Sequence, residues 1–286
     1  MYRSPVSTIK AVGACHIDVA CRPEWEGHAS AVGRLGLVTY DAWACTGSLL
    51  VAPGYESNPP FLLTANHCVS FQAQADSVEV WWLYQKAGCD DEAPPDVATV
   101  PRSTGGAALL AGAGAHEGSD FTLLLLTEAP PTPTAYLGYT TRPTTPTEAV
   151  FCAHHPQGTE KRISFGALSD TGSPRIGHQP MVSYDYYHEV LWLEGSTEAG
   201  SSGSPLLLEE TGQIIGQLYG GYASCLDMEE PDYFGKMDIT YPIIEPWLSG
   251  QYSIEGEGEI EGEGEGEGEQ LEGEGEGEGE NENEGE

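Results

Sequence analysis

The feature that most constrains the fold is the way in which turn residues interrupt the apolar sequence. From about Ala11 to Gly250, short apolar or alternating runs are separated by Gly, Pro, Ser and Thr, and no long segment has helical periodicity. Many short strands with turn residues between them are typical of an all-β barrel or sandwich. We predict one short helix at Ile243–Leu248. The predicted strands are Val32–Tyr40, Trp43–Val51, Phe61–Ala65, Val78–Tyr84, Phe121–Leu126, Ala149–Cys152, Lys161–Phe165, Val190–Leu193, Pro205–Leu208 and Ile214–Tyr219.

Two segments depart from this pattern. Pro130–Thr147 is rich in Pro and Thr and divides the strands into two groups, so we expect it to link two β units. Glu255–Glu286 is almost entirely Glu and Gly. Such a segment has too little apolar surface to offset the entropy of ordering, and its charges repel one another. We therefore predict a disordered acidic tail.

The charge balance limits the partners. The 286 residues include 45 Asp and Glu against 11 Lys and Arg, a net charge of −34, of which −16 lies in the Glu-Gly tail. A surface this acidic repels nucleic acid and anionic membranes and attracts basic peptides, although solubility alone also explains it. No apolar run is long enough to cross a membrane, so we expect neither nucleic-acid binding nor membrane insertion.

The chain contains seven widely spaced cysteines and no Cys-x-x-Cys pair. This spacing argues against a zinc site, and we predict no metal. Disulfides in an oxidising compartment, with one thiol left over, explain the cysteines better and indicate secretion. Met1–Lys10 nevertheless lacks the apolar core of a signal peptide.

Three short segments together indicate chemistry. FLLTANHC ends in His67, SDFTLLLL opens with Asp120 before an apolar run, and GSSGSP holds Ser202 between glycines. Singly, they are explained as a structural His, a strand cap and a linker. In the order His, Asp, Ser they supply a nucleophile, its general base and the carboxylate that fixes the imidazole tautomer. The N–H groups of Gly200 and Ser202 are candidates for an oxyanion hole.

These segments, with CTGSLL at Cys45–Leu50, HHPQGTEKRIS at His154–Ser164 and GQLYGG at Gly216–Gly221, resemble the trypsin-like serine peptidases. More narrowly, residues from about Ala14 to Trp247 resemble the bacterial lysyl endopeptidases. The resemblance implies two packed six-stranded antiparallel β-barrels with a short C-terminal helix. It divides the chain into an N-terminal extension at 1–10, a remnant of a pro-segment, a peptidase domain at 11–250 and the tail at 251–286. It implies a secreted monomer without a cofactor.

The resemblance also implies roles for individual residues. Asp232 would bind the ammonium group of the substrate, although the sequence alone places it in a surface acidic run with Asp227, Glu229 and Glu230. Leu218, Tyr219 and Gly220 would supply backbone hydrogen bonds to the substrate. The implied disulfides are Cys15–Cys225, Cys21–Cys89 and Cys45–Cys68, which leaves Cys152 as a buried thiol.

Some residues depart from the related enzymes. Ser201 replaces the Asp that precedes the nucleophile in trypsin, so activation by an N-terminal ammonium paired there is excluded. Tyr219 stands where lysyl endopeptidases commonly have His. His154 and His155 are interpreted as packing residues of the second barrel.

The sequence therefore predicts a serine endopeptidase that acts on protein or peptide substrates, on the carboxyl side of Lys. Three alternatives remain open. The first is a trypsin-like peptidase that cleaves after Arg and Lys, and the second is a Glu-specific peptidase. The third is an inactive binding module, against which the complete His67, Asp120 and Ser202 set argues.

Overall fold

The computed structural model describes residues 12–38, 44–89, 93, 95–131, 134–169 and 184–254. The chain divides into a compact unit, Met1–Ser253, and a second unit, Ile254–Glu286. The predicted extension at 1–10 and the Glu-Gly part of the predicted tail lie outside the described residues.

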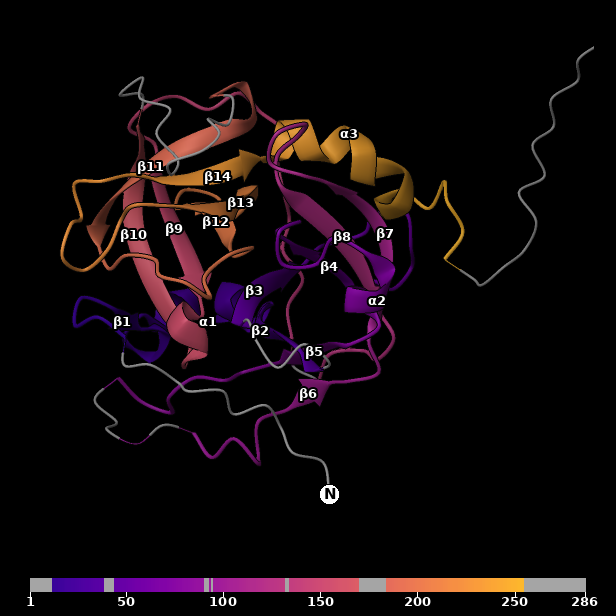
Figure 1. Cartoon of the computed structure of the whole chain (residues 1–286), viewed down its shortest axis with the longest axis horizontal. Coiled ribbons are helices and arrows are strands. Elements are labelled where there is room, and N and C mark those ends of the chain that lie inside the picture. Colours follow the sequence, from indigo (N-terminus) through magenta and orange to yellow (C-terminus); the bar gives the residue numbers. More distant parts are fainter. Residues whose placement is uncertain are drawn as a thin grey trace, which may run out of the picture. The chain divides into compact units, whose positions relative to one another are not determined.

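The first sheet is antiparallel, with the strand order β6-β5-β2-β3-β4-β8-β7 (Figure 1). Its central strands β4 and β8 are buried on both faces, which is why their sequences are continuous apolar runs rather than alternating ones. The strands are β2 (Val32–Leu37), β3 (Ala44–Leu49), β4 (Phe61–Thr64), β5 (Val78–Trp81), β6 (Arg102–Ser103), β7 (Ala107–Ala113) and β8 (Phe121–Leu126).

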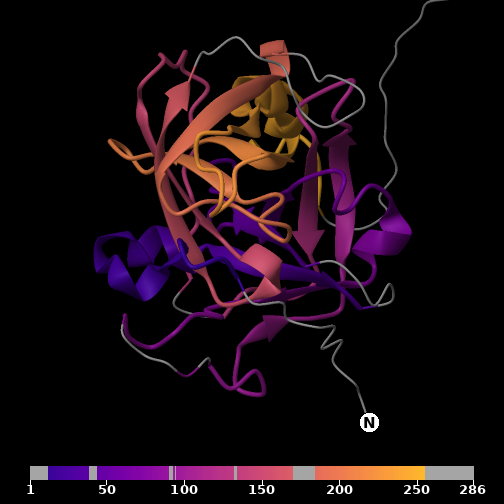
Figure 2. The ribbon, with the colours of Figure 1, turned by 60° about the vertical axis from the view of Figure 1, so that its left-hand side comes forward.

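The second sheet follows the order β1-β10-β11-β14-β13-β12-β9, and a further pairing between β9 and β10 closes six of its strands into a barrel. Its interior is filled by apolar side chains that include Val150, Val190, Trp192 and Phe234. The strands are β1 (Ile17–Asp18), β9 (Ala149–His154), β10 (Arg162–Ser169), β11 (Tyr187–Glu194), β12 (Pro205–Leu208), β13 (Ile214–Gly221) and β14 (Asp232–Lys236). Figure 2 shows the two groups of strands, with β2 to β8 in indigo to magenta and β9 to β14 in pink to orange.

The expected trypsin-like all-β fold is confirmed, with one difference between its halves. Among the described residues the first sheet stays open between β6 and β7, as a half-barrel. The edge of β7 is occupied by a side chain of α2 (Gln72–Ala75). Gln72 Nε2 donates to the carbonyl oxygen of Ala107 at 2.8 Å, and its Oε1 accepts from the N–H of Leu109 at 2.9 Å. This amide satisfies edge groups that another strand would otherwise pair.

The link between the two sheets is also confirmed. In the connection that leads from β8 to β9, Leu137 forms a bridge with Leu50 beside the first sheet, and Tyr139 forms one with Ile214 of the second. The connection therefore touches both halves.

The one predicted helix is longer in the structure, and further helices occur that the sequence did not predict. α3 spans Met237–Leu248 and begins six residues before the predicted start. The earlier turn is held because Met237 and Thr240 are buried and Thr240 Oγ1 lies 2.7 Å from Ser119 Oγ. α3 contacts β13, β14 and β7, so it packs on both halves. The sequence did not predict α2, α1 (Glu26–Ser30) or the short helical turns at Val19–Cys21, Pro23–Trp25, Pro156–Gly158 and Tyr184–Tyr186.

Four strands were not predicted. β1 and β6 have two residues each, too few to give a pattern, and β7 (AALLAGA) is made largely of Ala and Gly. β14 begins within the acidic run that suggested exposed surface. No helix in the described ranges is long and apolar enough to span a membrane.

Candidate active site

The pairing of two buried strands brings His67 to Asp120. His67 follows β4, Asp120 immediately precedes β8, and Thr64 of β4 lies opposite Thr122 of β8. His67 Nδ1 lies 2.6 Å from Asp120 Oδ2, and the His67 backbone N–H donates to Asp120 Oδ1 at 3.0 Å. The Asp120 side chain is 1% exposed, whereas that of His67 is 40% exposed. The carboxylate is therefore shielded from water, and the imidazole can meet a substrate.

The Asp120 backbone is held in an unusual conformation. Its φ is +53°, a left-handed value that Asp adopts more readily than most residues. Its carbonyl oxygen accepts the N–H of Asn66 at 3.1 Å, so main-chain and side-chain contacts both join Asp120 to the segment that carries His67.

The turn that carries Ser202 lies between the two halves. The Ser202 carbonyl oxygen accepts the N–H of Thr46 in β3 at 2.8 Å, and the Gly203 N–H donates to the carbonyl oxygen of Leu218 in β13 at 2.8 Å. Gly203 has a φ of +82°, and a Cβ there would overlap Thr64 Oγ1 and the Thr46 carbonyl. Only glycine fits this close approach to the first sheet.

Ser202 lies beside the disulfide next to His67. Cys68 follows His67, is bonded to Cys45, and has its Sγ 3.9 Å from the Ser202 carbonyl oxygen. The Ser202 hydroxyl makes no hydrogen bond within the described part of the chain, so the His67–Asp120 half of the predicted triad is formed and the Ser202–His67 hydrogen bond is not. Such hydrogen bonds are often long in a free enzyme and shorten when substrate binds.

The predicted oxyanion groups are unpaired. Around Ser202, the N–H groups of Ser201, Gly203 and Ser204 donate to protein carbonyl oxygens. Those of Gly200 and Ser202 have no acceptor among the described residues. Two unpaired N–H groups separated by one residue, with Gly200 at a φ of +97°, are what an anion-binding turn requires.

The structure separates Asp232 from its acidic neighbours. Asp227, Glu229 and Glu230 are exposed, whereas Asp232 is 1% exposed. Asp232 Oδ2 accepts hydrogen bonds from Trp192 Nε1 and Thr197 Oγ1, both at 2.7 Å.

The environment of Asp232 perturbs its ionisation. Burial raises the pKa of Asp232 to about 6, against the lowering effect of its hydrogen bonds. Gly221 lies opposite Asp232, and a Cβ there would overlap Asp232 Oδ1, so the glycine makes room for the carboxylate.

The predicted substrate-binding edge is partly engaged within the protein. The Leu218 N–H donates to the Ser204 carbonyl oxygen at 2.9 Å, and the Leu218 carbonyl accepts from Gly203. Leu218 therefore has only a second lone pair on its carbonyl oxygen to offer a substrate. Tyr219 and Gly220 are half-buried.

An aromatic stack, which the sequence did not predict, supports His67. The Tyr219 ring meets the His67 ring edge-on, with centroids 5.7 Å apart, and Tyr187 packs on Tyr219 at 5.5 Å. Tyr187 O–H donates to the carbonyl oxygens of Ala115 and Gly118, which lie just before Asp120. Like Trp192 and Thr197, Tyr187 is brought to the site by tertiary contacts, and no motif in its local sequence predicts that position.

The structure contains the three implied disulfides, Cys15–Cys225, Cys21–Cys89 and Cys45–Cys68. Cys152 is free, and burial raises the pKa of its thiol to about 12, which keeps it unreactive. His154 and His155 are fully buried, as expected of packing residues, and burial lowers the pKa of each imidazole well below its usual value.

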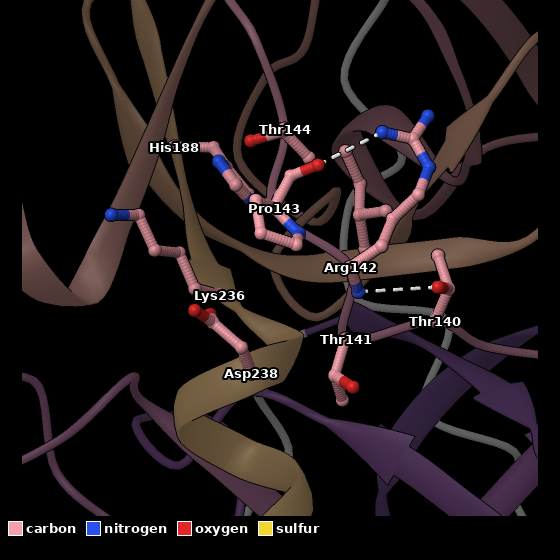
Figure 3. Close-up of a pocket in the computed structure, with 9 residues that line it drawn as sticks. Thr140, Thr141, Arg142, Pro143, Thr144, His188, Lys236 and Asp238 are labelled. Atoms are coloured by element: carbon pink, nitrogen blue, oxygen red, sulfur yellow. Dashed lines mark hydrogen bonds between the residues drawn. The ribbon is translucent and has the colours of Figure 1, made fainter.

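A separate hollow of about 220 Å³ lies beside β11 and β14 (Figure 3). None of the predicted catalytic or substrate-binding residues lines it. Its lining consists of Thr140, Thr141, Arg142, Pro143, Thr144, His188, Ile215, Lys236 and Asp238.

A closed barrel beside a half-barrel, with a buried Asp and a His at their junction, defines the class of trypsin-like serine peptidases. The family model of the lysyl endopeptidase C-terminal domain matches residues 9–235, and the chain belongs to this family. It is 28% identical over 254 residues to a lysyl endopeptidase from Pseudomonas aeruginosa, covering 84% of this chain and 52% of the relative. The chain thus spans about half the length of that relative.

Two solved structures illustrate the fold. Human heparin binding protein superposes with a TM-score of 0.55 at 17% identity, covering 84% of this chain and 96% of that one. A protease from M. tuberculosis in its active form gives a TM-score of 0.51 at 16% identity, covering 86% and 91%. At these identities the likeness shows the fold alone.

Proposed function

We propose that this chain is a serine endopeptidase that hydrolyses peptide bonds through an acyl-enzyme, on the carboxyl side of Lys. The observation that carries the proposal is the His67–Asp120 contact at 2.6 Å, with a shielded carboxylate and an accessible imidazole next to the Ser202 turn.

The geometry supports a role for each group. Asp120 accepts a hydrogen bond from His67 Nδ1–H, so the neutral ring presents its unprotonated Nε2 as the base. Nε2 takes the proton of Ser202 Oγ as that oxygen attacks the carbonyl carbon, and returns it to the leaving amine. Water then hydrolyses the ester by the same route. The free N–H groups of Gly200 and Ser202 would stabilise each oxyanion, and one such donor contributes about 3–4 kcal/mol.

The preference for Lys rests on Asp232. Its carboxylate is buried, receives only neutral hydrogen bonds, from Trp192, Thr197 and the backbone of Ala223, and has no cationic partner among the described residues. An unpaired buried charge is costly, so a bound ammonium would relieve a cost already present in the free enzyme. A Glu side chain would place a second negative charge beside Asp232, which disfavours the Glu-specific alternative. Arg is the competing cation, and its wider planar group needs more room than an ammonium.

The test of the activity is active-site titration with an organophosphate. We expect one equivalent to bind to Ser202 in the wild type and none in Ser202→Ala, with amide hydrolysis lost in parallel. A folded wild type that neither reacts nor cleaves would support the binding-module alternative instead. The Asp232→Asn variant separates the two parts of the proposal, because it should retain the titre and lose cleavage after Lys.

We further propose that the protein acts as a secreted monomer. Three disulfides support an oxidising compartment, in which such bonds persist. Sedimentation of the purified chain tests the monomer. Recovery of the oxidised protein from culture medium tests secretion.

A further inference from the structure

Glu198, four residues before Ser202, connects the Ser202 turn to a distant part of the chain. Its carboxylate is 17% exposed. Oε1 accepts the backbone N–H of Gly13 at 3.0 Å and lies 3.2 Å from Nε2 of the buried His16 ring. Oε2 accepts a hydrogen bond from Gln157 Nε2 at 3.2 Å. The side chain therefore faces the N-terminal segment rather than solvent.

The backbone of Glu198 builds the turn itself. Its carbonyl oxygen accepts the N–H of Ser201 at 2.9 Å, and its N–H donates to Ser201 Oγ at 3.2 Å. Ser201 Oγ also lies 2.7 Å from His154 Nδ1, inside the barrel. These reciprocal bonds consume the polar groups of Ser201 and leave the N–H groups of Gly200 and Ser202 unpaired. A displacement of Glu198 would therefore change where those two N–H groups point.

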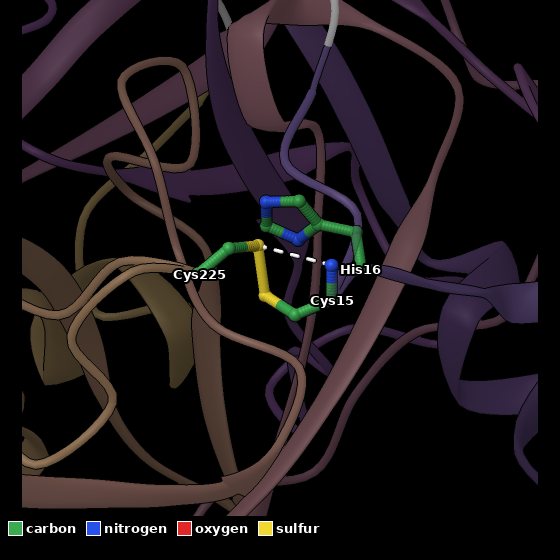
Figure 4. Close-up of side chains that lie close together, drawn as sticks. All are labelled: Cys15, His16 and Cys225. Atoms are coloured by element: carbon green, nitrogen blue, oxygen red, sulfur yellow. Dashed lines mark hydrogen bonds between the residues drawn. A yellow bond between two sulfur atoms is a disulfide. The ribbon is translucent and has the colours of Figure 1, made fainter.

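The N-terminal segment is fixed against the same place. The Cys15–Cys225 disulfide ties it to the loop that follows β13, and His16 lies beside this bond (Figure 4). Both sulfurs are in the disulfide, so Cys15, His16 and Cys225 are not a thiolate metal site. A Cβ at Gly13 would overlap Cys225 Sγ and would lie 2.8 Å from Glu198 Oε1. Gly13 is thus packed between the disulfide and the carboxylate, with its N–H directed at Glu198.

Glu194, four residues before Glu198, offers a comparison because its side chain forms a simple ion pair. Glu194, at the end of β11, pairs with Arg22 at 2.6 Å, also joins the N-terminal region to the second barrel, and is 55% exposed. Within the described residues, Arg22 is the one hydrogen-bond partner of its side chain. Glu198 differs because its backbone is hydrogen bonded to Ser201, inside the turn that carries Ser202.

We propose that Glu198 is a positioning residue through which the Gly13–His16 segment holds the Gly200–Ser202 turn in its anion-binding shape. This inference rests on the proposed role of Ser202 as the nucleophile. In trypsin the residue before the nucleophile is an Asp; here it is Ser201, and the carboxylate stands three residues earlier. Correct placement of the N-terminal segment is then a condition for catalysis but not for binding of the substrate cation at Asp232.

The experiment compares Glu198→Ala, Glu198→Gln and Gly13→Ala with the matched control Glu194→Gln, all on the full chain. Kinetics with a Lys-containing amide should show kcat reduced by about 100-fold in Glu198→Ala, the scale of one lost oxyanion donor. Glu198→Gln keeps an acceptor for the Gly13 N–H and should lose less. KM should change little, and Glu194→Gln should stay within about twofold of wild type.

Two binding probes separate the turn from the pocket. Affinity for a peptide boronate, which forms a tetrahedral adduct on Ser202, should fall in parallel with kcat. Inhibition by n-butylammonium, which needs only Asp232, should remain unchanged. A general loss of folding would weaken both probes together.

A double-mutant cycle tests the coupling. Gly13→Ala acts on the turn through Glu198 and also presses on the Cys15–Cys225 disulfide, so the loss of kcat in the double variant should be smaller than the product of the two single losses. Multiplicative losses, or a kcat in Glu198→Ala within twofold of the wild-type value, would overturn the coupling while leaving the proposed function intact.

Failure of the proposed function has a different signature, namely a wild type that does not react with an organophosphate. Amide hydrogen exchange then decides the coupling without catalysis. Exchange at residues 198–202 should accelerate in Glu198→Ala and in Gly13→Ala but not in Glu194→Gln. Unchanged exchange in both would contradict the coupling.

Discussion

The two halves of the molecule contribute to the site in different ways. The half-barrel has a core of Leu, Val and aromatic side chains and delivers His67 and Asp120 through the pairing of β4 with β8. The closed barrel buries ionisable groups that include Asp232, His154 and Cys152. In the first half the buried carboxylate of Asp120 is paired with His67, and in the second the buried carboxylate of Asp232 has only neutral partners among the described residues.

This difference has a cost in stability. Burial raises the pKa of Asp232 to about 6, and burial also lowers the pKa of the fully buried Lys161 to about 7. In each case the fold disfavours the charged form. Lys161 donates to the Ala29 carbonyl oxygen and Asp232 accepts from Trp192, and neither forms an ion pair with a described residue. The closed barrel therefore carries the energetically costly groups.

The largest effect is expected when the side chain of Ser202 or that of His67 is removed. Ser202→Ala and His67→Ala should each reduce kcat on an amide by on the order of 10⁵ to 10⁶, because the base and the nucleophile act as one unit. Combining the two should add little. Steady-state kinetics on folded variants, checked by circular dichroism, measures this. A kcat within tenfold of wild type in either variant would refute the assignment.

The next effect tests the pocket of the closed barrel. Asp232→Asn keeps the acceptor for Trp192 and Thr197 but removes the charge. We expect kcat/KM for a Lys substrate to fall by about 100- to 1000-fold, the scale of leaving a buried cation unpaired. Asp227→Asn, which changes an exposed carboxylate nearby, is the control. If the Asp232→Asn variant cleaves Lys substrates normally, the substrate cation must be bound elsewhere, with Asp227, Glu229 and Glu230 the next residues to test.

Much of the first half could be predicted from sequence, because His67 and Asp120 each adjoin an apolar strand that the sequence alone predicts. Asp232 was ambiguous, since four acidic residues within six positions look alike until the register of β13 with β14 buries one of them opposite Gly221. Glu198 and Tyr187 could not be predicted. Gly13 lies 185 residues from Glu198, and Ala115 and Gly118 lie 72 and 69 residues from Tyr187, and no local pattern encodes such contacts.

A smaller effect concerns stability. The folded pKa of Asp232, about 6, exceeds its usual 3.8, so ionisation opposes folding. The free energy of unfolding should fall as the pH rises from about 4 through 6, with the full penalty, about 3 kcal/mol, present above that range. Asp232→Asn should therefore melt higher than wild type at pH 8 and at the same temperature near pH 4. Equal melting at both pH values would show that burial imposes no such penalty.

The smallest effect concerns the open edge of the half-barrel. Gln72→Ala removes two hydrogen bonds to β7 and should lower the free energy of unfolding by about 1–2 kcal/mol. kcat should remain unchanged, because the Gln72 side chain bonds to the edge strand β7 and makes no hydrogen bond to His67 or Asp120. Urea unfolding measures the first quantity. A large loss of kcat would contradict this expectation and show that the open edge of the half-barrel affects the active site.

The central claim is that the two halves together form a peptidase that cleaves after Lys. A cleavage-site profile of the wild-type protein on a denatured protein mixture, read by mass spectrometry, tests it most directly. The account predicts new C-termini at Lys, few at Arg and none at Glu or Phe. Termini at Arg as frequent as those at Lys would contradict the Lys preference, and no cleavage by a correctly folded protein would contradict the function itself.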